Sequence, residues 1–548
     1  MQERPLVRNG KTILSGIDPV RRAERLANSV PVQDRTLYFC PSVLYGYGLD
    51  KLLTRLKTDA PNSMVLCVEA DPELYELTLK NITPSLTENK QLHITNVSPV
   101  DGLNAEKLCT FVRRSWSGKF RKIETVRFSG GWQLFPELYD LLYEALQQDI
   151  VTDWSNAIIM TKLGRLYMRN ALRNLPLIGY IPSLEKLSFG EAPVLVLGAG
   201  PSLDETLDTL VKLDSNTKSF KIICADTCLA VLKDRNITPD LVVILESQHW
   251  NLHDFIGCRG WKVPAAFDFS ALPQSGEVLG GEKYLFMTPW TSLSIFDRLN
   301  QAKLLPAVIP PLGSVGLTAV EIARRLTSGK IICAGLDFSF TTDKYHARST
   351  PGHLRKLNTQ TRFGGLFNNA AFSPASFPAL SKSGIPVRSN PVMQNYRNLF
   401  EREFAADERI FDLGGSGLAL GLKTLPLSEL QNFLTEKNEG TRKPDKTGSL
   451  QTVSHESQDL TLRERVTNFI EGEKNRLITL RDILSGKTSA AQEDLGRLIN
   501  ECDYLWAHFP DCAAGQKIHL TDTSAESTLS FLKRVSVEIT PALALFER

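Results

Sequence analysis

A glycine turn in the middle of the chain is the clearest sign of chemistry in the sequence. It lies between an apolar run, 193–197, and a helical pattern of leucines. Glycines in such a turn allow backbone conformations that a Cβ would resist, and they let the chain approach a ligand closely. Ser202 and Glu205 have the spacing of a capping box, which predicts a helix that begins at Leu203. A helix N-terminus presents free N–H groups and a positive dipole end, so we expect an anion there; the alternative is a plain tight turn. The candidate binding residues are Gly198, Gly200, Pro201 and Ser202.

Polar side chains also follow the next two apolar runs. Asp226 and Thr227 come after the run 221–225, and Glu246 comes after the run 241–245. Ligands in open α/β sheets bind at the carboxyl ends of the strands, so we expect these side chains to contact a substrate. Each of them could instead be an ordinary cap or loop residue.

A second glycine turn and a polar loop complete the set of candidates. Gly313 and Ser314 precede another helical pattern, and the apolar run 330–334 then leads to Asp337. His346 follows in a polar loop, where it could pair with Asp337 for acid/base chemistry or balance the charge of a phosphate or leaving group. The alternative is a structural role, which is the more frequent one for a single histidine.

The sequence predicts no metal site and no nucleic-acid partner. Its nine cysteines form no Cys-x-x-Cys pair, and His249 and His253 share a helix face without a third ligand nearby. Scattered thiols of this kind fit a reducing, cytoplasmic setting. Lys and Arg total 63 against 61 for Asp and Glu, and the resulting net charge of +2 is too small for a nucleic-acid footprint.

Short apolar runs separated by helical segments must position these residues. Several runs are unbroken stretches of Val, Ile and Leu, which is typical of strands buried on both faces. We therefore predict an α/β fold whose central part is a doubly wound, mainly parallel sheet. The predicted strands are 193–197, 221–225, 241–245, 284–287, 307–309 and 330–334.

The front of the chain has the outline of a β-α-β unit. Apolar runs at 36–40 and 64–68 flank a helical pattern, and Glu69 ends the second run. An acid at such a tip often binds a ribose, but Gly46 and Gly48 alone do not complete the G-x-G-x-x-G pattern. We interpret this part as a Rossmann-like domain without ligand chemistry; a nucleotide or methyl-donor site is the alternative.

A chain of 548 residues exceeds what one hydrophobic core usually holds. A helical stretch at 152–175 connects the front to the central part, and the final segment has helical periodicity. The N-terminus lacks an apolar signal core and no window reaches the ~20 apolar residues that span a bilayer, so we expect a cytoplasmic protein without membrane contact. The predicted domains are 1–150 (Rossmann-like), 151–432 (central), 433–460 (linker) and 461–548 (helical).

Taken together, these motifs resemble the motility-associated factor (Maf) family, which shares its central domain with archaeal 6-hydroxymethylpterin diphosphokinase-like proteins. The resemblance covers roughly 193–421, and the parts before and after are similar in arrangement only. The matching motifs, in chain order, are 198–204, 236–240, 313–315, 335–340, 344–347, 395–397, 400–401 and 414–418.

The resemblance implies a sialyltransferase-like enzyme that transfers nonulosonic (sialic-acid-like) sugars from CMP-sugars to Ser or Thr hydroxyls of flagellin, as flagellum assembly and motility require. It implies no cofactor beyond the CMP-sugar donor. On this hypothesis the two glycine turns hold the phosphate and the ribose, Asp337 or Glu246 is the base, and His346 lies near the leaving phosphate. Glu246 is a departure, because the family frequently has Asp there.

Two other functions stay open. The archaeal branch makes a pterin diphosphate with ATP and magnesium, and such an enzyme needs carboxylates for the metal, whereas departure of a CMP group can be stabilised by helix N–H groups. No Asp-x-Asp pair occurs in the central part, although Asp226, Glu246 and Asp337 could supply ligands from separate strands. A non-catalytic flagellin-binding assembly factor would use the helical tail for docking, but it would not need acids at several strand ends.

Overall fold

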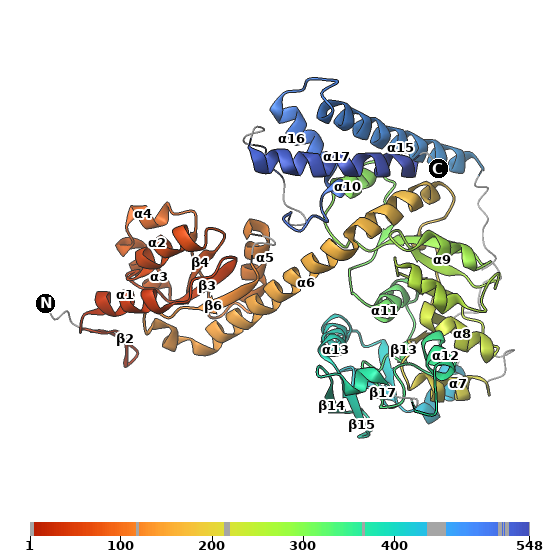
Figure 1. Cartoon of the computed structure of the whole chain (residues 1–548). Coiled ribbons are helices and arrows are strands. Elements are labelled where there is room, and N and C mark those ends of the chain that lie inside the picture. The colour runs from red at the N-terminus through yellow and green to blue at the C-terminus, as the bar shows by residue number, and fades with distance from the viewer. Residues whose placement is uncertain are drawn as a thin grey trace. The chain divides into compact units, whose positions relative to one another are not determined.

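The computed structural model describes residues 5–116, 120–212, 220–363, 368–435, 456–512, 518, 520 and 525–546. The chain forms two compact units. Unit 1 comprises Met1–Gly164 and Trp506–Ile518, and unit 2 comprises Arg165–Leu505 and His519–Arg548. The two units meet in sequence inside the long helix α6 (Pro136–Asn174), whose second half is the helix predicted at 152–175 (Figure 1).

Unit 1 contains a parallel four-stranded sheet in the order β5-β4-β3-β6, as predicted for a Rossmann-like domain. β3 and β4 are runs of mainly apolar residues that are buried on both faces of the sheet, and helices cover both faces. The strands of this sheet are β3 (Thr36–Pro41), β4 (Met64–Glu69), β5 (Leu92–Asn96) and β6 (Lys122–Thr125), and β1 (Leu6–Arg8) and β2 (Lys11–Leu14) form a separate two-stranded sheet. The helices before α6 are α1 (Pro19–Ser29), α2 (Leu49–Asp59), α3 (Pro72–Asn81), α4 (Pro84–Thr87) and α5 (Asn104–Trp116).

Glu69, the acid at the tip of β4, is buried and bonded by the protein itself. Its carboxylate accepts hydrogen bonds from the Ser42 hydroxyl at 2.6 Å, the Ala70 N–H at 3.0 Å and the Tyr139 hydroxyl at 3.2 Å. Burial raises the pKa of Glu69 despite these bonds. The acid therefore holds the β3 and β4 ends together, which favours the interpretation of this domain as one without ligand chemistry.

Unit 2 is built on a nine-stranded sheet in the order β12-β11-β10-β9-β8-β7-β13-β16-β17, and all its pairs are parallel. The predicted α/β fold class is thus confirmed, and each of the six predicted central strands has a counterpart. The strands are β7 (Val194–Leu197), β8 (Lys221–Ala225), β9 (Leu241–Ile244), β10 (Ala265–Asp268), β11 (Lys283–Met287), β12 (Ala307–Val308), β13 (Ile331–Ala334), β16 (Ile410–Leu413) and β17 (Lys423–Leu425).

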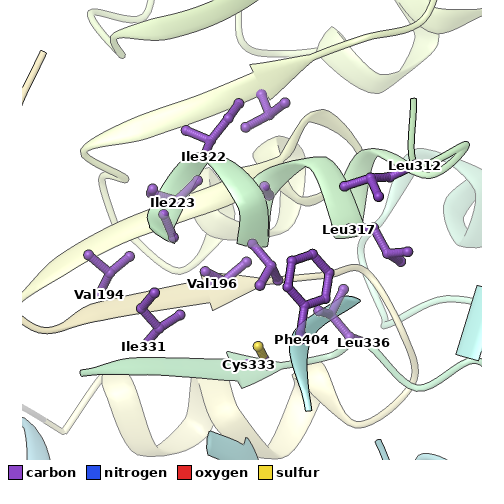
Figure 2. Packing of buried hydrophobic residues seen from close by; sticks show 14 of the residues in the cluster. Val194, Val196, Ile223, Leu312, Leu317, Ile322, Ile331, Cys333, Leu336 and Phe404 are labelled. Carbon is purple, nitrogen blue, oxygen red and sulfur yellow. The ribbon is translucent and has the colours of Figure 1, made fainter. Parts of the chain in front are cut away.

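The strand order reverses once, between β7 and β13. After β12 the chain returns through α11 (Val315–Leu326), which packs against β7, β8 and β9, and enters β13 on the other side of β7. Figure 2 shows Leu317 and Ile322 of this helix in the apolar layer with Val196 and Ile223 of the sheet. The carboxyl ends of β7 and β13 therefore form the topological switch point, where open α/β sheets bind ligands.

The remaining elements of unit 2 surround this sheet. The elements are α7 (Leu203–Leu210), α8 (Leu229–Asp234), α9 (Pro273–Val278), α10 (Ser294–Gln301), α12 (Pro351–Asn358), β14 (Phe377–Leu380), β15 (Pro386–Ser389), α13 (Pro391–Phe404) and α14 (Leu430–Thr435).

In the described part of the chain, no helix is both long enough and apolar enough to cross a membrane.

The predicted helical C-terminal region is present; its helices belong to unit 2, whereas Trp506–Ile518 belongs to unit 1. Its helices are α15 (Glu456–Leu484), α16 (Gln492–Glu501) and α17 (Glu526–Phe546). The carboxylate of Glu473, with a side chain only 1% exposed, pairs with both Arg298 of α10 (2.7 Å) and Arg476 (2.8 Å). Most of the predicted linker 433–460 lies outside the described residues; its first three residues end α14 and its last five begin α15.

Candidate functional site

At the switch point, the turn after β7 packs directly against the turn after β13. The Gly198 N–H donates to the Ala334 carbonyl and the Gly200 N–H to the Gly335 carbonyl, both at 2.8 Å. A Cβ on Gly200 would lie 2.7 Å from that Gly335 oxygen and 2.6 Å from Asp337 Oδ2. The approach of the two backbones therefore requires glycine at 200.

Asp337 occupies the N-terminus of α7. The helix begins at Leu203 as predicted, but Ser202 donates its N–H to Asp337 Oδ2 at 2.7 Å and its hydroxyl to Asp337 Oδ1 instead of capping the helix. The Leu418 N–H donates to the Asp337 carbonyl at 2.9 Å. Asp337 is 3% exposed, and burial raises its pKa. The protein's own carboxylate thus takes the position where the sequence predicted a bound anion.

Asp204, in the first turn of α7, anchors the loop that carries His346. Lys344 Nζ lies 2.9 Å from Asp204 Oδ2, and the Arg348 N–H donates to Asp204 Oδ1 at 2.9 Å. The Ala347 N–H donates to the Ala199 carbonyl at 2.9 Å. The motif around the first glycine turn and the motif around His346 are therefore parts of one packed structure.

His346 is half-buried and does not pair with Asp337, whose carboxylate binds Ser202. The Tyr345 ring meets the imidazole edge-on with 4.9 Å between centroids. Burial, together with the nearby Lys356 ammonium, lowers the pKa of His346 to about 4. The imidazole is therefore neutral near pH 7 and can donate or accept a hydrogen bond.

The N-terminus of α11 lies at the switch point as well. Gly313 has a φ of +68°, and a Cβ there would lie 3.2 Å from the Tyr396 ring of α13. A Cβ on Gly316 would meet Leu336, the same side chain that a Cβ on Gly198 would meet. Within the described residues, the Ser314 side chain makes no cap for α11. Among the described residues no carboxylate caps the N-terminus of α11, whereas Asp337 accepts the N–H of Ser202 just before α7, so the α11 N-terminus is the better candidate for an anion.

Carboxylates stand on the same edge of the sheet at the ends of β8 and β9. Glu246 is exposed, and its Oε1 accepts the N–H groups of Ser247 at 2.9 Å and Gln248 at 3.1 Å. Asp226 is buried and accepts the Asn251 amide at 2.8 Å and the Thr227 N–H at 2.9 Å. The fixed, solvent-facing carboxylate of Glu246 suits a general base better than a buried one.

Asp226 is one of two carboxylates that share the Asn251 amide. The other, Asp254, lies 3.5 Å from that nitrogen. Burial and the charge of Asp254 raise the pKa of Asp226 to about 7, and burial raises the pKa of Asp254 to about 6. One proton can therefore reside on this pair near neutral pH.

Two tyrosines that the sequence reasoning missed lie within electrostatic reach of Glu246. Burial and then the Glu246 charge raise the pKa of Tyr167, on α6, to about 12, and the same causes raise the pKa of Tyr396. Both hydroxyls therefore stay protonated and can donate hydrogen bonds. Tyr396 belongs to a motif of the family resemblance, which is a signal that could have found it; Tyr167 lies in a plain helical pattern and carried none.

The predicted residues fall into two groups. The first glycine turn and Asp337 form a packed unit, while Gly313, Ser314 and Glu246 stand around the edge of the sheet together with Tyr396, which was not predicted. Among the described residues, no group of three His, Cys, Asp or Glu side chains is arranged to hold a metal ion.

Comparison with known proteins finds a match both to the pterin diphosphokinase-like domain and to the Maf family. The family model "6-hydroxymethylpterin diphosphokinase MptE-like" matches residues 169–343. The solved structure of a MAf glycosyltransferase from Magnetospirillum magneticum AMB-1 superposes with a TM-score of 0.53 at 14% identity, covering 100% of this chain and 84% of that one.

Two relatives found by their sequences are uncharacterized proteins. An uncharacterized protein of Treponema pallidum (strain Nichols) is 28% identical over 546 residues, which is 96% of this chain and 90% of its own. Another uncharacterized protein of that organism is 28% identical over 168 residues, 28% of this chain and 41% of its own. The resemblance of the central domain to MptE-like proteins and of the whole fold to the MAf glycosyltransferase is confirmed.

Proposed function

We propose that this chain is a cytoplasmic glycosyltransferase that moves a nonulosonic sugar from a CMP-sugar to Ser or Thr hydroxyls of flagellin. The proposal rests above all on Tyr396, whose ring lies 3.2 Å from the position of a Cβ on Gly313 and whose pKa the Glu246 charge helps to raise. Tyr396 therefore relates the N-terminus of α11, which we take as the phosphate site, to the exposed carboxylate of Glu246 on the same edge of the sheet. The fold that the chain shares with a MAf glycosyltransferase supports sugar transfer as the reaction.

The reaction needs a proton acceptor and a place for the leaving phosphate. Glu246 takes the proton of the acceptor hydroxyl as its oxygen bonds to the anomeric carbon of the sugar. The bond between that carbon and the phosphate oxygen breaks, and CMP leaves with the electron pair. The N–H groups of the first turn of α11 and its dipole stabilise the phosphate, and the neutral His346 imidazole or the Tyr396 hydroxyl donates to it.

The residues of the first glycine turn have a positioning role on this proposal. Gly198, Gly200 and Ser202 lock the β7 turn to Asp337, and Asp204 holds the His346 loop. Asp226 and Thr227 line the same edge through the Asn251 network.

A melting-temperature assay of the purified protein tests the nucleotide. CMP without metal is expected to raise the melting temperature at concentrations well above its dissociation constant. Gly313→Val, which puts a branched side chain against Tyr396, is expected to remove the CMP shift. A shift with ATP, magnesium and 6-hydroxymethylpterin but none with CMP would contradict the proposal.

The match of residues 169–343 to the MptE-like model favours one alternative, an ATP-dependent pterin diphosphokinase, and the same assay separates the two. The acceptor is tested by intact-mass spectrometry of flagellin from a strain that lacks this protein. Loss of the sugar mass is expected; unaltered flagellin mass would contradict sugar transfer and favour a non-catalytic flagellin-binding factor.

A further inference from the structure

Beside Glu246, the end of α6 meets the loops that follow β9, β10 and β11. Asn170 donates through Nδ2 to the Ser247 carbonyl at 2.9 Å and the Ser270 carbonyl at 3.2 Å. One turn further along the helix, Asn174 donates to the Phe269 carbonyl at 3.0 Å and the Ala271 carbonyl at 2.9 Å. These bonds fix the helix end to the carboxyl edge of the sheet.

The orientation of both amides follows from these bonds. Carbonyl oxygens only accept hydrogen bonds, so the NH₂ group must face them and Oδ1 must point away. Both Asn side chains are 0% exposed, and within the described residues neither Oδ1 has a partner. Each is therefore a buried acceptor without a donor among the described residues, which is unfavourable as long as it stays unpaired.

Two donors in the same place also lack partners. The Ser247 hydroxyl is buried in a residue that is 1% exposed, and the Trp290 indole N–H is buried as well; in the described part of the chain neither has a hydrogen-bond partner. Trp290 packs edge-on against Tyr167 with 5.8 Å between ring centroids, and Tyr167 precedes Asn170 by three residues on α6. We call Tyr167, Asn170, Ser247 and Trp290 the edge cluster.

The charge around the edge cluster selects against anions. Tyr167 lies close enough to Glu246 and Asp268 for both carboxylates to raise its pKa, after burial. Asp268 is 0% exposed and accepts the Ser270 and Thr288 N–H groups at 2.7 and 2.8 Å. A phosphate or a carboxylate would be repelled here, whereas hydroxyl and amide groups would find both donors and acceptors, and aromatic rings suit the apolar faces of a sugar.

We propose that the edge cluster binds the uncharged, hydroxyl- and amide-bearing part of the donor sugar, so that Tyr167, Asn170, Ser247 and Trp290 determine which sugar is accepted. This inference rests on the proposed function. It assigns the two ends of the donor to different elements: the phosphate to the α11 N-terminus and the neutral end of the sugar to α6 and the β9–β11 loops.

Two variants remove little more than atoms without a protein partner. Ser247→Ala deletes the unpaired hydroxyl, and Trp290→Phe deletes the unpaired N–H and keeps an aromatic ring. Thr36→Val is the matched control, because Thr36 Oγ1 in unit 1 is also buried without a partner among the described residues. Isothermal titration calorimetry measures the affinity of each protein for CMP, CMP-N-acetylneuraminate and CMP-pseudaminate.

The wild type is expected to bind at least one CMP-sugar more tightly than CMP. Since one neutral hydrogen bond contributes about 1 kcal/mol, each cluster variant should weaken that CMP-sugar about 5-fold and leave CMP within twofold. The control should change neither, and Ser247→Ala should melt no lower than the wild type. Unchanged affinity for the CMP-sugar in both variants would mean that the cluster holds only water.

Other outcomes separate this inference from the proposed function. Equal losses for CMP and CMP-sugar would place the nucleoside at the cluster and overturn the inference. Equal affinity of the wild type for CMP and both CMP-sugars would overturn it too, and would leave the proposed function standing. A wild type that binds none of the three ligands would overturn both.

Discussion

Replacing Gly200 by alanine would insert one methyl group into the contact between the β7 and β13 turns. The new Cβ would lie 2.6 Å from Asp337 Oδ2 and 2.7 Å from the Gly335 carbonyl oxygen. Neither atom can retreat easily, because the first accepts the Ser202 N–H and the second accepts the Gly200 N–H itself. Overpacking costs about 1–3 kcal/mol, and weakening a charged hydrogen bond adds about 1.5–3 kcal/mol.

We therefore expect Gly200→Ala to reduce the free energy of unfolding of unit 2 by about 2.5–6 kcal/mol. Gly496→Ala is the matched control, since a Cβ on Gly496 in α16 has no atom within 4 Å and alanine should stabilise that helix by about 0.5–1 kcal/mol. Urea unfolding followed by far-UV circular dichroism measures both variants. A Gly200→Ala midpoint equal to that of the wild type would refute the argument that backbone approach requires glycine here.

Three further predictions concern charges. The pKa of Asp226 is about 7 in the folded chain against an ordinary 3.8, so its protonated form stabilises the fold at low pH and this stability is lost as pH rises toward 7. The stability of Asp226→Asn relative to the wild type should therefore rise by up to about 4 kcal/mol between pH 4 and pH 8. Equal differences between the urea midpoints of the two proteins at the two pH values would contradict this. Glu246→Gln should lower the transfer rate by about 10²–10⁴-fold and leave CMP affinity unchanged in calorimetry, whereas a normal rate would exclude Glu246 as the base. Glu473→Ala, which leaves Arg298 of α10 without its carboxylate partner, should lower the free energy of unfolding in urea by about 3–5 kcal/mol. A loss below about 1 kcal/mol would show that the ion pair does not hold the C-terminal helices.

Local sequence patterns predicted the strands of unit 2 well where Val, Ile and Leu form unbroken runs. Three strands of its main sheet, β10, β16 and β17, were missed. The residues of β10, Ala265–Asp268, are mostly small, and none of the three strands is an unbroken run of Val, Ile and Leu. The start of α7 was predicted correctly from Ser202, although the capping box that motivated it is absent. The Ser202 hydroxyl binds Asp337 instead, across 135 residues of chain, and no local spacing encodes such a contact.

The candidate site shows the same limit. Strand ends at Asp226 and Glu246 were predicted from the rule that parallel strands present their carboxyl ends to ligands. Asn170 and Asn174 were not, because polar residues on a helix ordinarily indicate a solvent-exposed face. Their burial depends on four loop carbonyls that become neighbours only when the sheet has formed.

The division of the chain also has a consequence for how it is made on the ribosome. Unit 1 includes Trp506–Ile518, so its last piece is translated some 340 residues after Gly164. At about 5–20 residues per second, that interval lasts roughly 20 to 70 s. Met1–Gly164 is therefore made well before the last segment of its unit, and a simple truncation at residue 164 lacks Trp506–Ile518, which makes it a poor candidate for expression.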